Sequence, residues 1–302
     1  MLKIEYNNTD LDKYYEIISN RKMQKFGNRT FESYYNSYIK NKVGDYSLRN
    51  ILCGDFNKLL EIKNKLDKKY SSKTNIMKQF FNYDKSSKKA KLKTSLFQPE
   101  ISKFFEENIE VHTCYYCNID FINTFKKGNE TKNAFTLDHV LEKADYPFLA
   151  LSLYNLVPSC YVCNSKVKDS KITFEDLSPT KEDFDFDKKV KFKSFITNEN
   201  LQIEKEKDFY VKLIESYSNK YDKYIESLNL NNRYDYHKYK VLEMIQKRRE
   251  YPDTRIKELS DLTKKTQEEI KQDLFGIYTN EDLHKRPLSK LIKDISEELD
   301  LI

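Results

Sequence analysis

The sequence predicts an α+β protein, with a small zinc-stabilised core of two short strands and a helix flanked by mainly helical N- and C-terminal regions. Two C-x-x-C pairs, strand-like segments between them and apolar residues at helical spacing elsewhere lead to this prediction. The stretch 114–168 contains both pairs and organises the chain. The predicted regions are 1–110, 111–170 and 171–302.

Four of the five cysteines form the two pairs, Cys114 with Cys117 and Cys160 with Cys163. Two such pairs supply the thiolates of a tetrahedral Zn²⁺ site, and four thiolates leave the ion no open position, which is typical of a structural metal. Buried free thiols and disulfides are the alternatives, although disulfide frameworks suit small secreted chains. Zinc ribbons separate their pairs by about 15–20 residues, so the longer gap here indicates an insert.

The insert and its flanks contain the strand signals. Ala134–Leu141 predicts one strand, and Asn155–Ser159 predicts a second strand that runs into the closing pair. Asn164–Lys168 predicts the first turn of a helix that starts at the cysteines. An Asp-His dipeptide, Asp138 and His139, lies near the end of the first strand.

This arrangement resembles the HNH endonuclease family, whose ββα-metal core carries a His at the end of the first strand, an Asn in the connecting loop and a His or Asn on the helix. Those positions fall on His139, Asn155 and Asn164, so the pattern is H-N-N. The resemblance implies that His139 is the general base and that Asp138 and Asn164 hold a catalytic Mg²⁺ or Mn²⁺. It also implies that Asn155 braces the loop and orients His139.

The residue types suit phosphodiester hydrolysis. The reaction needs a base, a cation that stabilises charge on the phosphate and the leaving oxygen, and a rigid frame. The neutral form of a histidine such as His139 is well populated near pH 7, since its ordinary pKa is about 6.5, and Asn oxygens suit hard cations. A turn-capping role for Asp138, and ordinary capping by Asn155 and Asn164, are the alternatives.

The flanking residues extend the resemblance. D-H-x-x-x-K and Y-P-x-L-A-L within 138–151, followed by N-L-V-P-S-C-x-x-C-N-x-x-x-K, look like the HNH subunit of the Septu anti-phage system and its retron-associated relatives. R-P-L-S-K-L-x-x-D-I, at 286–295, is similar to a tail segment of the same group. Glu142 departs from this pattern, which has Pro there. The resemblance implies an oligomeric bacterial defence complex with an ABC-type ATPase subunit.

Composition limits the other classes of function. The 302 residues are 34% charged, with a mean hydropathy of −0.81. No stretch approaches the run of about 18 apolar residues that a membrane helix needs. The first residues, MLKIEYNNTD, resemble neither a signal nor a transit peptide, so a cytoplasmic location without a membrane partner is expected.

Charge is unevenly distributed. The segment 62–96 holds eleven Lys and two Asp, a net of +9, whereas the whole chain carries +6. Such a segment could follow a phosphate backbone of DNA, or it could be a solvated surface loop. The role of the N-terminal region is otherwise open.

The C-terminal region is predicted from its apolar spacing. A hairpin is expected from Phe192–Ile196 and Leu201–Glu204. Helices follow from the 3.6-residue period, at Phe209–Ser227, Asn232–Glu250, Asp253–Phe275 and Leu288–Leu299.

A metal-dependent endonuclease that hydrolyses DNA is the function that the motif favours. The alternative is a zinc-stabilised nucleic-acid-binding or adaptor module without catalysis. The Asp-His and Asn pattern separates the two, because a pure binding module does not need a general base.

Overall fold

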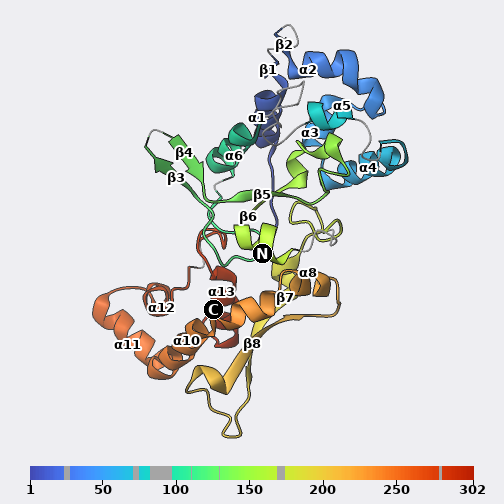
Figure 1. Cartoon of the computed structure of the whole chain (residues 1–302). Coiled ribbons are helices and arrows are strands. Elements are labelled where there is room, and N and C mark those ends of the chain that lie inside the picture. Colours follow the sequence, from blue (N-terminus) through green and yellow to red (C-terminus); the bar gives the residue numbers. More distant parts are fainter. Residues whose placement is uncertain are drawn as a thin grey trace.

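The computed structural model of the chain describes residues 1–23, 28–70, 75–81, 97–109, 111–128, 130–168, 174–278 and 281–302. In Figure 1 the N-terminal helices form the upper part, the strands β5 (Thr136–His139) and β6 (Leu156–Ser159) cross the middle, and the C-terminal strands and helices form the lower part. Buried apolar side chains from all three parts form one continuous cluster. No described helix is long and apolar enough to cross a membrane.

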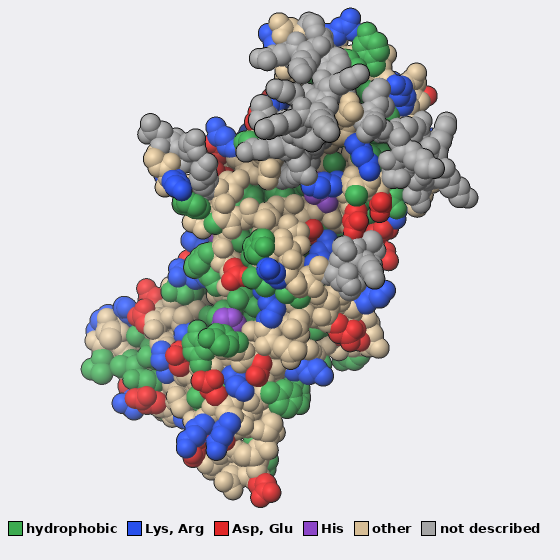
Figure 2. Space-filling model, viewed as in Figure 1, with side chains coloured by type: hydrophobic (Ala, Val, Ile, Leu, Met, Phe, Trp, Pro, Cys, Tyr) green, Lys and Arg blue, Asp and Glu red, His purple; other side chains and the backbone are tan. Residues whose placement is uncertain are grey.

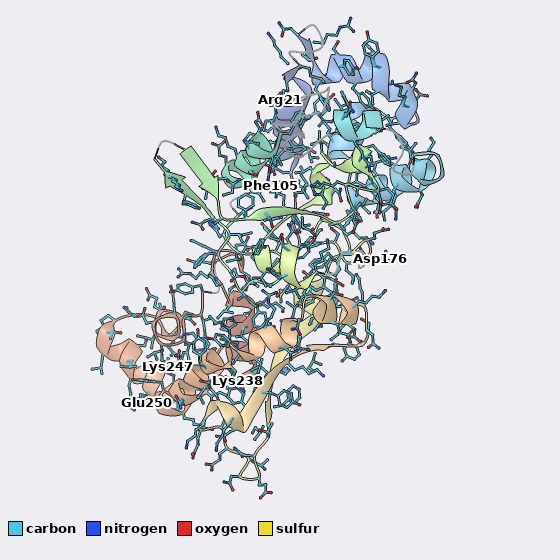
Figure 3. The ribbon with its side chains drawn as sticks, viewed as in Figure 1. Arg21, Phe105, Asp176, Lys238, Lys247 and Glu250 are labelled. Atoms are coloured by element: carbon cyan, nitrogen blue, oxygen red, sulfur yellow. The ribbon has the colours of Figure 1, made fainter. Side chains whose placement is uncertain are left out.

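Helices dominate the N-terminal part. Its first helix, α1 (Asn8–Ser19), begins with a reciprocal cap in which Asn7 and Asp10 each accept the other's backbone N–H. After α1, Arg21 (labelled in Figure 3) pairs with Glu100 of α6 (Phe97–Asn108) at 3.0 Å. The elements between are β1 (Lys22–Met23), β2 (Arg29–Thr30), α2 (Phe31–Tyr34), η2 (Tyr35–Ile39), η3 (Lys40–Val43), α3 (Leu48–Cys53), α4 (Phe56–Tyr70) and α5 (Asn75–Phe80).

The lysine-rich segment is only partly described. Positions 71–74 and 82–96, which carry most of its lysines, lie outside the described residues. Elsewhere on the surface, among the described residues in the lower part of the face shown by Figure 2, Lys and Arg side chains are mixed with Asp and Glu and form no separate basic patch. The proposed phosphate-tracking role of 62–96 therefore stays a prediction.

The two central strands are confirmed, although each is shorter than predicted. β5 and β6 pair antiparallel, with Thr136 opposite Ser159 and His139 opposite Leu156. The chain then passes Cys160 into the π-helix η6 (Cys163–Val167), which takes the place of the predicted helical turn. Two short helices connect the strands, η4 (Pro147–Leu149) and η5 (Leu153–Asn155).

The insert also contains a hairpin that the pattern analysis missed. β3 (Thr124–Lys127) and β4 (Glu130–Asn133) pair antiparallel and project to the left in Figure 1. Gly128 stands at their turn with φ of +64°, a conformation that Gly adopts without strain. The glycine between two polar segments is the sequence feature from which this hairpin could have been predicted.

Two C-terminal predictions are wrong. β7 (Val190–Ile196) pairs with β8 (Phe209–Glu215), whereas 209–215 was predicted as helix and Leu201–Glu204 as the second strand. Burial along β8 alternates residue by residue, with Phe209, Val211 and Leu213 inside. A period of two defines a half-buried strand, and the apolar residues at 209–213 fit that period as well as a helical one.

The other predicted C-terminal helices are present, but two of them are each divided, and two short helices were not predicted. Asn232–Glu250 divides into α9 (Leu230–Asp235) and α10 (Lys238–Glu250), which carries Lys238 and Lys247 of Figure 3. Asp253–Phe275 divides at Lys264, which has φ of +62°, before a new cap at Thr266. The others are α7 (Phe186–Lys189), η7 (Glu206–Asp208), α8 (Asp222–Ser227), α11 (Asp253–Thr263), α12 (Gln267–Phe275) and α13 (Ser289–Glu298).

Candidate functional site

A pocket of about 320 Å³ opens where β5 ends. It brings together three of the four predicted catalytic residues, Asp138, His139 and Asn164. Successive strand residues normally point to opposite faces, but both Asp138 and His139 reach this pocket because the strand ends at His139. The lining residues are Leu137, Asp138, His139, Glu142, Lys143, Ala144, Asn164 and Lys168.

His139 is held by a backbone carbonyl. Its Nε2 lies 2.9 Å from the carbonyl oxygen of Ala150. Because a carbonyl only accepts hydrogen bonds, Nε2 carries the proton in this contact, and in the neutral ring Nδ1 then has the basic lone pair. The residue is half-buried at the pocket wall.

The loop that carries Ala150 is fixed by the N-terminal helices. Tyr14 of α1 donates its hydroxyl to the carbonyl oxygen of Leu151 at 2.8 Å, and both groups are buried. The hydroxyl of Ser152 donates to the carbonyl oxygen of Ile51 in α3. The N-terminal region thus positions the partner of His139.

Asn155 lies behind the pocket and does not line it. Its amide oxygen accepts the backbone N–H of Leu141 at 2.7 Å, and its amide nitrogen donates to the carbonyl oxygens of Leu141 (3.1 Å) and Leu149 (2.9 Å). The side chain is fully buried. The loop from the end of β5 to Ala150 is thus tied at both ends, because Asn155 bonds to Leu141 near its start and to Leu149 near its end.

Asp138 is buried, and one of its carboxylate oxygens accepts hydrogen bonds from two side chains. Tyr116 donates its hydroxyl to Oδ2 at 2.6 Å, and the ammonium of Lys168 lies 2.5 Å from Oδ2, with both charged side chains under 10% exposed. Burial, together with the nearby carboxylate, raises the pKa of Tyr116 far above its ordinary value, so the phenol stays a donor. Asp138 and Lys168 therefore form a buried ion pair at the wall of the pocket.

Asn164 approaches the same pocket from the other side. It is the second residue of η6, directly after Cys163, and its backbone N–H donates to the carbonyl oxygen of Cys160 at 3.1 Å. The side chain is half-buried and lines the pocket. The cysteine cluster therefore fixes the position of this residue through the covalent chain.

The four paired cysteines form a cluster that fits zinc. Their sulfur atoms all lie within 4.8 Å of one another, all four residues are buried, and none is in a disulfide. A tetrahedron with Zn–S bonds of about 2.3 Å has edges of about 3.8 Å, and the sulfurs of Cys117 and Cys160 are 4.0 Å apart. Backbone N–H groups point at three of the sulfurs, from Ile119 (3.4 Å), Cys160 (3.3 Å) and Cys163 (3.4 Å), as thiolate ligands require.

The fifth cysteine has a different environment. Cys53 of α3 is buried, and burial raises the pKa of its thiol to about 12. Its Sγ lies 3.5 Å from the carbonyl oxygen of Leu11. Cys53 thus behaves as a small core residue and is not part of the metal-binding set.

Three further residues at these sites were assigned no role from the sequence. Glu142 and Lys168 line the pocket, and Arg233 of α9 donates to the sulfurs of Cys163 and Cys117 at 3.1 and 3.4 Å. The ammonium of Lys168 reaches a carboxylate 30 positions away in the chain. Lys168 is the last residue of the C-N-x-x-x-K motif, but the motif alone does not reveal this contact, and the contact of Arg233 has no local sequence signal.

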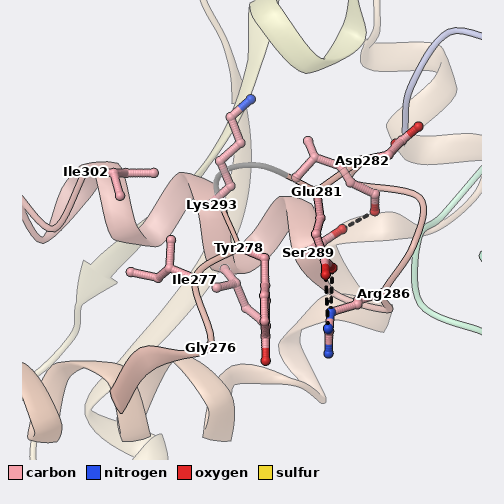
Figure 4. Close-up of a pocket in the computed structure, with 11 residues that line it drawn as sticks. Gly276, Ile277, Tyr278, Glu281, Asp282, Arg286, Ser289, Lys293 and Ile302 are labelled. Atoms are coloured by element: carbon pink, nitrogen blue, oxygen red, sulfur yellow. Dashed lines mark hydrogen bonds and ion pairs between the residues drawn. The ribbon is translucent and has the colours of Figure 1, made fainter. Parts of the chain in front are cut away.

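A second pocket shares no lining residue with the first. It measures about 290 Å³ and lies between the segment after α12 and α13. Figure 4 shows Arg286 directed at Glu281, with which it makes an ion pair at 2.8 Å, beside the ring of Tyr278. Its lining holds no residue of the Asp-His and Asn pattern.

Comparison with known proteins gives one match. The family model described as HNH endonuclease matches residues 114–170. No curated protein and no solved structure matches the chain. The matched segment contains the four cysteines, Asn155 and the pocket with Asp138, His139 and Asn164. Within this chain, residues 114–170 are thus an HNH endonuclease domain, which indicates a nuclease.

Proposed function

We propose that the protein is a metal-dependent endonuclease that hydrolyses phosphodiester bonds of DNA in the pocket at the end of β5. The observation that carries this proposal is the convergence of Asp138, His139 and Asn164 on one pocket inside the segment that matches the HNH family model. Two oxygen-donor side chains and an imidazole are the groups that such a hydrolysis needs.

The base in this proposal is His139. Its Nε2–H is committed to the carbonyl oxygen of Ala150, so Nδ1 is the nitrogen that takes a proton from the attacking water. Asn155 maintains the loop conformation on which that contact depends. General-base catalysis of this kind contributes about 10²- to 10⁴-fold in rate.

The donor set for a catalytic cation consists of the Asp138 carboxylate and the Asn164 amide oxygen. Oxygen ligands of this type suit Mg²⁺ and Mn²⁺, and a bound ion would supply positive charge to the phosphate and the leaving oxygen. Lys168 pairs with the carboxyl group of Asp138 and orients it, and it adds a second positive charge at the pocket. The four cysteines would hold zinc, and the bound ion would fix η6, and hence Asn164, against the strand pair.

The test is cleavage of supercoiled plasmid by purified protein with Mg²⁺, with Mn²⁺ and with chelator. Cleavage is expected with either metal, and His139→Ala should reduce the rate by a factor of about 10² to 10⁴. His112→Ala is the matched control, because His112 is half-buried two residues before the matched segment and lines a different pocket. Absence of cleavage by zinc-loaded, folded wild type would instead favour the binding or adaptor module.

The cellular setting is a separate part of the proposal. The likeness of 138–168 and 286–295 to the HNH subunits of Septu-type and retron-associated systems supports a cytoplasmic antiviral complex with an ABC-type ATPase. Purification of the tagged chain from its native host should recover an ATPase in a fixed ratio. Recovery of the chain alone, with full nuclease activity, would contradict this part without affecting the first.

A further inference from the structure

The zinc-binding cluster has a cationic neighbour that comes from outside the HNH domain. Arg233, on α9, places its two terminal nitrogens on two different sulfurs, with Nη1 at 3.1 Å from Cys163 and Nη2 at 3.4 Å from Cys117. One of these cysteines belongs to each C-x-x-C pair. Arg233 therefore bridges the two halves of the cluster.

Electrostatics favours this arrangement. Four thiolates around Zn²⁺ carry a net charge of −2, which is costly to bury without compensation. A guanidinium is always protonated, and its planar fork can donate to two acceptors at once. The Arg233 side chain is only 15% exposed, and Asp120 is the nearby carboxylate, with Oδ2 at 3.8 Å from Nη2. The charge of Arg233 is thus partly shielded from water next to the thiolates.

Helix α9 is held against the first cysteine pair by neighbouring contacts. Tyr234 donates its hydroxyl to the carbonyl oxygen of Cys117 at 2.5 Å, and Tyr224 of α8 donates to that of Tyr116 at 3.1 Å. The side chain of Asn231 accepts the N–H of Leu213 in β8 at 2.9 Å. The arginine is thereby fixed in position by the C-terminal fold.

The tail segment contacts the same cysteine pair. Asn118, which follows Cys117 and is buried with φ of +53°, donates to the carbonyl oxygens of Leu283 and Arg286 and accepts the N–H of Lys290. Its own carbonyl oxygen accepts the N–H of Leu288 at 2.7 Å. The motif at 286–295 therefore forms part of the surface that packs on the cluster.

We infer that Arg233 is a positioning residue of the zinc site, which neutralises the thiolates of Cys117 and Cys163 and so couples zinc binding to docking of the C-terminal region. This inference rests on zinc occupying the four cysteines and does not depend on the nuclease chemistry. Loss of zinc should release α9, and loss of the guanidinium should weaken zinc binding.

The first experiment measures zinc affinity by competition with a chromogenic chelator. Arg233→Met keeps much of the side-chain volume and removes both donors, and it should weaken zinc binding about 10- to 100-fold, as outer-sphere substitutions do. Arg233→Lys keeps the charge and should recover part of the loss. The matched control is Tyr234→Phe, which removes a bond from the same helix to the backbone of Cys117 and leaves the sulfurs untouched.

The Co²⁺-substituted protein separates a direct effect on the sulfurs from a general structural one. Removing a cationic donor raises the energy of the thiolate electrons, so the thiolate-to-cobalt absorption of Arg233→Met should move to longer wavelength. The Tyr234→Phe spectrum should match wild type. An unchanged zinc affinity and spectrum in Arg233→Met, or a wild-type protein that binds no zinc, would overturn the inference.

Hydrogen exchange of the wild-type protein, with and without zinc, tests the coupling between zinc binding and docking of the C-terminal region. It needs no Arg233 variant. Chelation of zinc from the wild type should speed amide exchange in α9 and at Leu288–Lys290, while α3 stays protected. Equal protection of α9 with and without zinc would show that docking is independent of the metal and would refute the coupling.

Discussion

The two clusters within 114–170 are built and supported in opposite ways. The cysteine cluster is closed, buried and contacted by the C-terminal region through Arg233 and Asn118. The pocket at the end of β5 is open and charged, and the loop behind it is held by the N-terminal region through Tyr14. A site that only stabilises structure can be closed, whereas a site that acts on a phosphate must admit it. The N-terminal region thus contacts the loop behind the open pocket, and the C-terminal region contacts the closed cluster.

Breaking the cysteine cluster should have the largest effect on stability. Zinc bound to four thiolates contributes several kcal/mol to folding, so chelation or Cys117→Ser is expected to lower the melting temperature by about 10 °C or more. Metal analysis should find one zinc per chain in the wild type. Cys53→Ala is the matched control, because Cys53 lies outside the cluster, and it should retain the zinc. A chelator-treated protein that melts like the untreated one would contradict this assignment.

Substitutions of Asn155 and Asn164 should separate a residue that supports the loop behind the pocket from one that lines the pocket itself. Asn155→Ala leaves the buried N–H and carbonyl oxygen of Leu141 without partners and removes one of the two bonds to the carbonyl oxygen of Leu149, and it should lower the free energy of unfolding by about 3 kcal/mol. Asn164→Ala, at the half-buried pocket wall, should change stability by less than about 1 kcal/mol and still lower the cleavage rate. Urea unfolding and plasmid cleavage of both variants measure this, and equal destabilisation by the two would remove the distinction.

Asp187 anchors the C-terminal support and gives a pH-dependent test. Burial opposes its ionisation, but the charges of Lys290 and Lys293 outweigh burial and lower its pKa to about 2 from 3.8. Because the pKa of Asp187 is lower in the folded than in the unfolded protein, its ionisation stabilises the fold at any pH above the unfolded-state pKa. This contribution is lost as the pH falls from about 4 to 2. Asp187→Asn should therefore lower the free energy of unfolding by about 2 kcal/mol, equally at pH 7 and pH 5. A difference that disappears by pH 5 in urea unfolding would exclude this ion pair as the cause.

The smallest expected effect concerns two tyrosines, one in each of the two regions that flank the domain. Tyr14→Phe and Tyr234→Phe each remove one hydroxyl that donates to a buried backbone carbonyl, and each should cost about 1 kcal/mol in urea unfolding. Only Tyr14→Phe should also slow plasmid cleavage by zinc-loaded protein, because its partner loop holds His139. Equal cleavage by the two variants would show that the N-terminal region does not tune the pocket.

Local patterns were sufficient for the parts of the domain that a short stretch of chain determines. The cysteine spacing predicted the cluster that can bind zinc. The apolar run around Asp138 and His139 predicted β5, and Asn155–Ser159 predicted its partner strand. The likeness to HNH proteins identified the side chains that now line one pocket or brace its loop. Their catalytic roles remain predictions.

The missed features depend on tertiary contacts or on ambiguous periodicity. The C-N-x-x-x-K motif includes Lys168 but does not show that its partner is Asp138, and Arg233 looks like an ordinary surface residue until the fold brings it to the thiolates. β8 was mistaken for a helix because F-Y-V-K-L-I satisfies both periods, and only its pairing with β7 decides between them. The connection between α11 and α12 was missed because Lys264 takes a left-handed conformation without being Gly.

Chemical rescue of His139→Ala tests the central claim most directly. If the imidazole of His139 removes a proton in the pocket, the variant should cleave plasmid about 10²- to 10⁴-fold more slowly than wild type while keeping its zinc and melting temperature. Added imidazole should then restore part of the rate, and more so above pH 7, where it is neutral. A His139→Ala protein that cleaves as fast as wild type without imidazole would contradict the account.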